Sequence, residues 1–244
     1  MPASVTSTMS ALTLFPGLED IGPWYRAEVH GLTEAQLDFA VPAPAPEWLW
    51  WSIRRQTSHI ARVFFLWLFS LWENRLWDGA PPPVHDLPSI LQRPPEGQPA
   101  ARQHYPHTYG AIDVLLARLD EEIVLTQEVL RRHTVAQAQQ KTTTLTLAPR
   151  VQGIMAQLQP AHPQGFAPSP MDATQWIVSL EGTGRHLYFE ALTHLYNIQR
   201  LKRAQGLSAC IRLPRVGYYV LPGWDNDLQE GTEARETGSP NGSA

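Results

Sequence analysis

The chain has 244 residues, a formal net charge of −4 and one cysteine, Cys210. Without a basic block it lacks the cationic surface that non-specific nucleic-acid binding requires, and one cysteine allows neither a disulfide framework nor a thiolate metal cluster. Its most apolar stretch, Val63–Trp72, is far shorter than the ~20 residues of a membrane span, and the N-terminus lacks the basic region of a signal peptide. We therefore expect a cytoplasmic protein that binds neither nucleic acid nor membrane.

The first part of the chain predicts one helix between irregular segments. Residues 1–14 are expected to be disordered. Within Phe15–Val29, apolar residues recur at three- and four-residue steps, which predicts an amphipathic helix that begins or kinks at Pro23 and ends near Gly31. Three prolines within Val41–Pro46 predict an extended connector.

The stretch Trp51–Trp77 predicts one long central helix. Ser52 suits its N-cap. One wide apolar face follows, made by Ile53, Gln56, Ile60, Val63, Phe64, Trp67, Leu68, Leu71 and Trp72. His59 lies near the edge of this face, where an unpaired polar group costs roughly 1–3 kcal/mol. Two interpretations stay open for His59: a core histidine bonded to a nearby carbonyl, or a metal ligand that projects into a helical bundle.

Pro-rich loops and helices alternate after the central helix. A long loop over Asp78–Pro106 precedes a third helix, whose apolar stripe runs over residues 112–130. Residues 134–144 are predicted to be loop. A shorter helix is expected over residues 146–158, and another Pro-rich loop over residues 159–170.

The region Asp172–Gln205 predicts helix, but its division stays open. It is either one helix or two helices broken at Gly182 and Gly184, with Thr183 able to cap the second part. Gly206 is a natural stop at its C-terminal end.

The organisation predicted from these patterns is one all-α domain over residues 15–224. Ile211–Leu221 is expected to cover one end of the helices. Residues 225–244 are rich in Gly, Glu, Ser and Asn, and we expect a disordered tail there.

Three polar residues share a face of the last predicted helix. His186, Glu190 and His194 are spaced four apart, so successive members can reach a shared ion. The two histidines are about 12 Å apart along the axis and cannot bind one metal together. The pair is therefore His186 with Glu190 or Glu190 with His194, and His59 is the obvious third ligand. Such a site suits Zn²⁺, Ni²⁺, Fe²⁺ or Mn²⁺; the alternative is an exposed ion pair without metal.

Two of these stretches resemble motifs of the DinB-like/YfiT-like superfamily. WSIRRQTSHIARV is similar to its second helix, which begins W-S-[IV]-R and carries a histidine in the run that follows. EALTHLYNI is similar to its fourth helix, which carries H-x3-H and a glutamine three residues on. The resemblance makes His59 the first ligand, puts Glu190 and His194 in place of the two histidines, and puts Asn197 in place of the glutamine.

The resemblance spans roughly Phe15–Gly206 and implies a four-helix bundle with long Pro-rich inter-helix loops and a C-terminal extension. Glu190 departs from the family pattern, because a harder oxygen donor alters metal preference and affinity. His186 stays the alternative metal ligand.

The same resemblance implies a function. Characterised relatives include thiol-dependent S-transferases and a maleylpyruvate isomerase that use mycothiol, bacillithiol or glutathione. We therefore expect a divalent-metal-dependent S-transferase or hydrolase that acts on a small electrophilic molecule, with a low-molecular-weight thiol as cosubstrate. Arg62 could meet a carboxylate of that thiol, or snorkel over an aromatic ring at the surface, and Asn197 is the second expected cosubstrate contact.

Two further expectations concern assembly and the rival function. Relatives often pair through helix faces, which implies a homodimer. The alternative function is a non-catalytic, stress-associated bundle for binding or dimerisation, with a weak metal site or none.

Overall fold

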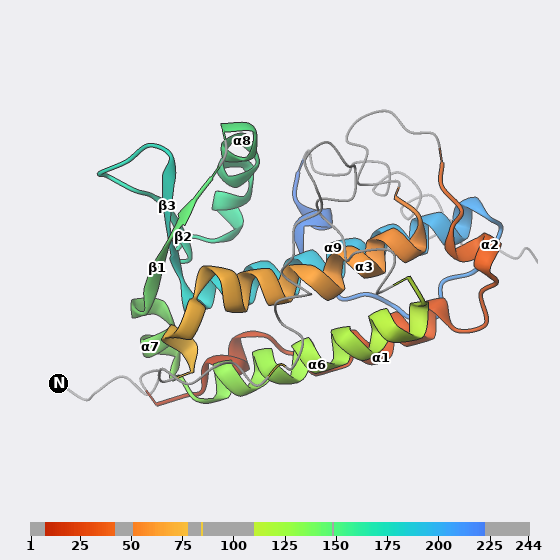
Figure 1. Ribbon diagram of the computed structural model, residues 1–244, viewed down its shortest axis with the longest axis horizontal. Helices are drawn as coiled ribbons and strands as arrows, with labels where there is room; N and C mark the ends of the chain where they lie inside the picture. The colour runs from red at the N-terminus through yellow and green to blue at the C-terminus, as the bar shows by residue number, and fades with distance from the viewer. Residues whose placement is uncertain (1–7, 42–50, 78–83, 85–109, 148, 223–244) are drawn as a thin grey trace, which may run out of the picture.

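A computed structural model describes residues 8–41, 51–77, 84, 110–147 and 149–222. Four helices form its body (Figure 1): α1 Ile21–Val29, α3 Ile53–Phe65, α6 Ile112–Arg131 and α9 Leu180–Ala204. α3 packs against α6 and α9, and α1 packs against the same two helices. The expected helical bundle is confirmed, with a small sheet and several short helices added to it.

The central helix begins as predicted and changes form before its predicted end. The Ser52 hydroxyl accepts a hydrogen bond from the Arg55 N–H at 3.3 Å, as an N-cap does. After α3 the chain continues as a π-helix, η5 Leu66–Leu71, and then as a 3₁₀ turn, η6 Glu73–Leu76. The prediction of one regular helix over Trp51–Trp77 was therefore wrong in its second half, where Glu73 has a φ of 51°.

The N-terminal segment is ordered from Ser10 onward, which corrects the expectation of disorder over residues 1–14. Two 3₁₀ turns, η2 Ala11–Leu14 and η3 Leu18–Asp20, precede α1. The Ala11 N–H donates to the His133 carbonyl at 2.8 Å, and the Ala11 side chain is fully buried. Residues 1–7 lie outside the described residues.

A three-stranded antiparallel sheet lies at the end of the bundle where α9 begins (Figure 1). Its order is β1-β3-β2, with β1 Thr142–Thr146, β2 Phe166–Pro168 and β3 Gln175–Ser179. The loops predicted over 134–144 and 159–170 therefore contain secondary structure. The short helices of the described chain are α2 Glu34–Leu37, α7 Val135–Gln140, η8 Gln159–Ala161 and η9 Tyr218–Val220. The helix predicted over 146–158 is α8 Pro149–Leu158.

The region Asp172–Gln205 is neither one helix nor two, but a strand followed by one helix. β3 runs directly into α9, and the Ser179 hydroxyl caps the helix by accepting from the Gly182 N–H at 2.9 Å. Gly182 lies within the helix without breaking it. A glycine is needed there because the backbone of Gly165 lies so close that a Cβ on residue 182 would collide with it. Thr183 lies inside the helix and accepts a hydrogen bond from the Trp72 indole N–H at 2.9 Å.

The sheet and α8 build a second hydrophobic cluster against the bundle core. Its buried members are Met155, Leu158, Phe166, Trp176, Val178 and Tyr218. Trp67, Leu71 and Phe189 pack against both clusters, so they join the sheet to the helices.

We expected the segment after α9 to cover one end of the bundle. Instead it runs along α9. The Ile211 carbonyl accepts from Gln199 at 2.9 Å, and the Thr193 hydroxyl accepts from the Tyr218 N–H at 3.1 Å. The predicted loop 78–106 apart from Val84, the connector at 42–46 and the tail 225–244 lie outside the described residues. Among the helices that the structure describes, none has the length and apolar character to cross a membrane.

Candidate metal centre

Three side chains from two helices converge inside the bundle: His59 of α3, and Glu190 and His194 of α9. Oε2 of Glu190 lies 3.2 Å from Nε2 of His194 and 3.8 Å from Nε2 of His59. Each residue offers one ligand atom within 4.8 Å of the other two. Both histidines are buried, whereas the Glu190 side chain is 16% exposed. The cluster is therefore open to solvent through its carboxylate.

Helix packing places these residues. His59 lies on α3, which packs directly against α9, and the four-residue spacing puts Glu190 and His194 on one face of α9. The Tyr25 hydroxyl donates to the Ala191 carbonyl at 2.9 Å, so α1 also contacts this turn of α9. Rigid helices, rather than loops, thus carry all three side chains.

Trp51 and Gln56 surround the histidines on the α3 side. The Trp51 ring meets the His59 ring edge-on at 5.5 Å between centroids and stacks on the His194 ring at 6.5 Å. Gln56 Oε1 is hydrogen-bonded to Nδ1 of His194, while Gln56 Nε2 donates to the Trp51 carbonyl at 3.2 Å. These contacts cover the buried side of the cluster and hold the His194 ring in place.

The carboxylate of Glu190 is held in its charged form. Burial alone would raise the pKa of Glu190, but the close imidazoles of His194 and His59, together with that of His186, hold that pKa well below its usual value. The charge acts on its neighbours in turn: burial, and then Glu190, raise the pKa of Tyr25 well above 10. The site therefore carries a negative charge, which suits a cation.

His186, the alternative ligand, belongs to a neighbouring cluster. Its Nδ1 lies 2.6 Å from the Tyr218 hydroxyl, which is also bonded to Nε2 of His162 at 2.7 Å. Its ring packs on Trp67 at 4.1 Å between centroids. Glu190 and His194 are the pair that the fold brings to His59, and the alternative of an exposed ion pair is wrong because His194 is 2% exposed.

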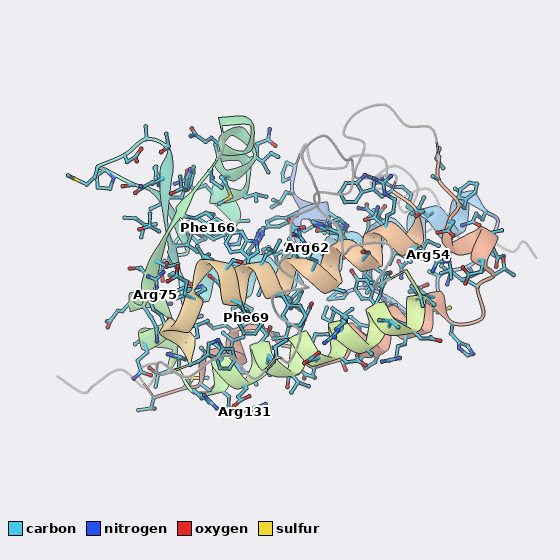
Figure 2. The ribbon with its side chains drawn as sticks, viewed as in Figure 1. Arg54, Arg62, Phe69, Arg75, Arg131 and Phe166 are labelled. Atoms are coloured by element: carbon cyan, nitrogen blue, oxygen red, sulfur yellow. The ribbon has the colours of Figure 1, made fainter. Side chains whose placement is uncertain are left out.

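The two expected cosubstrate contacts are both buried. Arg62 is 3% exposed, so a surface arginine that snorkels is excluded, and Figure 2 shows it on the side of α3 away from α6. Asn197 follows His194 on α9 by one turn and is fully buried. Its amide has no hydrogen-bond partner within the part of the chain that the structure describes.

Sequence reasoning missed three residues around this centre. Gln56 was assigned to the apolar face, although a glutamine among apolar residues is a signal of a buried polar contact. His162 and Tyr218 lie in a loop and in the C-terminal segment, and no spacing links them to each other or to α9.

The donor set fits a divalent ion. Two imidazoles and one carboxylate are ligands of catalytic zinc and of other first-row metals. A family model of the DinB superfamily matches residues 25–178. The chain belongs to the DinB superfamily.

The matched region begins within α1, contains α3 with His59, and ends just before α9. Two of the three candidate ligands of this DinB-superfamily protein therefore come from a helix beyond the match. Comparison with curated proteins and with solved structures finds no match.

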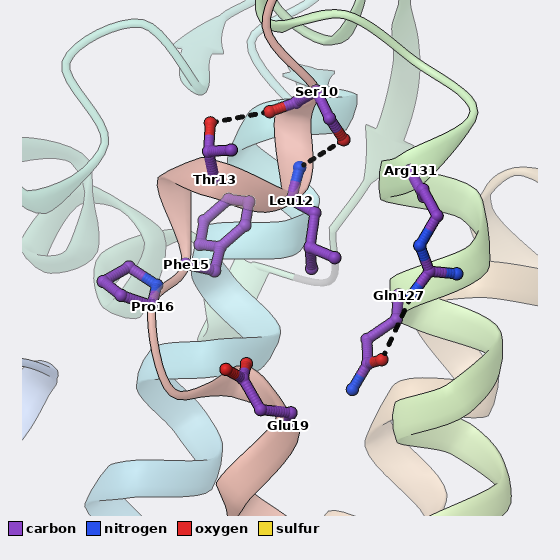
Figure 3. Close-up of a pocket in the computed structure, with 8 residues that line it drawn as sticks. All are labelled: Ser10, Leu12, Thr13, Phe15, Pro16, Glu19, Gln127 and Arg131. Atoms are coloured by element: carbon purple, nitrogen blue, oxygen red, sulfur yellow. Dashed lines mark hydrogen bonds between the residues drawn. The ribbon is translucent and has the colours of Figure 1, made fainter.

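A surface groove of about 530 Å³ lies elsewhere, between residues 10–19 and the C-terminal part of α6 (Figure 3). Leu12, Phe15 and Pro16 provide its apolar wall, and Arg131 stands opposite. None of the three clustered ligands lines it. We assign the chemistry to the His–Glu–His cluster, because a groove alone supplies no reactive groups.

Proposed function

We propose that this protein is a divalent-metal-dependent enzyme, a thiol-dependent S-transferase or a hydrolase, that acts on a small electrophilic molecule. The observation that carries the proposal is the convergence of His59, Glu190 and His194 from two rigid helices. Two neutral imidazoles and one carboxylate would hold the ion, leaving it with one net positive charge.

The ion would supply Lewis acidity, which lowers the pKa of a thiol or of water near it. The protein's own residues would do the rest. His59 and His194 present nitrogen donors from buried positions, Trp51 packs against both rings, and the partly exposed Glu190 marks the side from which a small molecule enters.

The thiol-dependent chemistry comes from the family resemblance. Within the chain, the buried amide of Asn197 supports binding of a polar group of the cosubstrate, and Arg62 stays the contact that the sequence predicts for a carboxylate. A buried amide without a partner costs about 1–3 kcal/mol, which a bound cosubstrate would recover. The small-molecule substrate, the homodimer and the cytoplasmic location stay predictions from the sequence.

Metal analysis tests the metal centre. We expect the purified wild type to hold about one Zn²⁺, Ni²⁺, Fe²⁺ or Mn²⁺ per chain and to lose thermal stability on chelation. His59→Ala and His194→Ala should abolish that content. His30→Ala, which changes an exposed histidine at the end of α1, should retain it. A wild type without metal, and without a response to chelator, would favour the non-catalytic bundle.

Activity is tested separately on the metal-loaded protein. Glutathione, mycothiol and bacillithiol are each offered with monochlorobimane, and conjugate formation is followed by fluorescence. We expect turnover with one of the three thiols, and we expect His59→Ala to abolish that turnover. Metal binding without turnover by any thiol would favour the hydrolase.

A further inference from the structure

The side-chain amide of Gln56 contacts the backbone carbonyl of Trp51 and a ring nitrogen of His194. Its Nε2 lies 3.2 Å from the Trp51 carbonyl, and its Oε1 contacts Nδ1 of His194. Gln56 is fully buried and sits one turn before His59 on α3. The same side chain therefore spans the tryptophan that packs on the site and a ligand of the proposed ion.

The two contacts allow only one arrangement of hydrogens. A backbone carbonyl only accepts hydrogen bonds, so the Gln56 amide must turn its NH₂ toward Trp51. The amide oxygen then faces His194, and an amide oxygen also only accepts. Nδ1 of His194 must therefore carry the hydrogen, and in the neutral ring the lone pair lies on Nε2.

We propose that Gln56 is a positioning residue that holds His194 as the Nδ1–H tautomer and so keeps its Nε2 available for a metal ion. This inference rests on the proposed metal site and deepens it. Metal-binding histidines commonly donate their second N–H to such a partner, which fixes tautomer and ring orientation and raises ligand basicity.

The geometry around Nε2 supports this role. Nε2 faces Oε2 of Glu190 at 3.2 Å, so with Nδ1 protonated two acceptors face each other across that distance. Such a pair is stable only with a cation between them, either a proton on Nε2 or a metal ion. When the ion binds, that proton, where present, leaves to solvent.

The tautomer can be observed without any metal. We expect ¹⁵N imidazole spectra of the chelator-treated wild type to show a hydrogen on Nδ1 of His194, with or without a second one on Nε2. Comparison with His194→Ala assigns the signals. A neutral His194 protonated at Nε2 would overturn the proposal.

Variants of Gln56 then test the effect on affinity. Gln56→Leu removes the acceptor, and we expect its Zn²⁺ affinity to fall about 10- to 100-fold, with loss of the Nδ1–H preference. Gln56→Glu keeps an acceptor at this position and should retain affinity within a few-fold. Gln199→Leu removes another buried amide, which bonds Glu28 away from the site, and should leave affinity unchanged.

The outcomes separate the two proposals. Unchanged affinity in Gln56→Leu would overturn the role of Gln56 while leaving the metal site intact. A wild type that binds no metal would overturn the proposed function, and the imidazole spectra would still decide the tautomer.

Discussion

The hydroxyl of Tyr218 lies 2.6 Å from Nδ1 of His186, and His186 precedes Glu190 of the candidate metal site by one helical turn. The same hydroxyl contacts His162 at 2.7 Å. All three side chains are buried. One phenol oxygen thus joins the C-terminal segment, the loop before β2 and α9.

Removing that oxygen should destabilise the fold. Tyr218→Phe takes a hydrogen-bond partner from two buried imidazoles, and each loss costs about 1–3 kcal/mol. We expect unfolding in urea to show a loss of about 2–6 kcal/mol in the free energy of unfolding. Tyr219→Phe is the matched control, since its hydroxyl bonds only the nearby Pro214 carbonyl among the described residues, and it should lose less than about 1.5 kcal/mol. Equal stability of the two variants would contradict this account.

His162 predicts how stability depends on pH. Burial, and then the neighbouring side chains of His186 and Arg185, lower the pKa of His162 from 6.5 to about 2. Between pH 6.5 and the pKa in the folded protein, His162 is protonated in the unfolded chain but not in the folded protein, so stability is lost as pH falls below 6.5. The loss is about 1.4 kcal/mol per pH unit, or about 2 kcal/mol at pH 5.

His162→Gln keeps a donor for Tyr218 but does not titrate. We expect the difference in unfolding free energy between wild type and this variant to shift by about 2 kcal/mol from pH 7 to pH 5, in favour of the variant. A difference that stays constant over that range would show that His162 accepts its proton in the folded protein.

Glu122 predicts a pH effect of the opposite sign. It is fully buried on α6, and its carboxyl oxygens find no hydrogen-bond partner among the described residues. Burial, and then the charge of Glu121, raise the pKa of Glu122 well above 4.5. The unfolded chain ionises first, so stability falls as pH rises from the unfolded pKa through the folded one.

Glu122→Gln should therefore gain stability relative to wild type as pH is raised from 4 to 8, measured by thermal unfolding in a pH series. Glu121→Gln, on a partly exposed neighbour paired with Arg118, should not show that gain. A wild type and a Glu122→Gln variant whose melting curves move in parallel would refute the prediction.

The contact of Gly182 with Gly165 predicts a site-specific steric effect. Gly182→Ala places a methyl group against the Gly165 backbone and should destabilise by about 1–3 kcal/mol. Gly153→Ala, in α8 and with nothing within 4 Å of the added carbon, should instead stabilise by about 0.5–1 kcal/mol. Chemical denaturation of both variants checks the sign, and a stable Gly182→Ala would mean that the two backbones separate easily.

The candidate metal ligands could be predicted from the sequence because they follow helical periodicity. The apolar face around His59 and the four-residue step from Glu190 to His194 are local patterns. The choice between His186 and His194 could not be made from spacing alone. It depends on how α9 is rotated against α3, which tertiary packing decides.

The sheet was missed for a different reason. The β-branched run within Gln175–Ser179 is a strand signal, but it adjoins a strongly helical segment and was joined to it. Gly182 was weighed as a helix breaker, whereas its role is to let Gly165 approach. Contacts between residues distant in sequence, such as Tyr218 with His162, leave no local pattern to find.

The partial exposure of Glu190 implies an order in which a metal ion and an anionic thiol would bind at the candidate metal site. In the ion-free protein an arriving molecule meets a carboxylate first, which repels other anions. Binding of a divalent cation would change the net charge at that entrance from −1 to +1. An acidic thiol would then be admitted only after the ion, so its affinity should depend on metal occupancy.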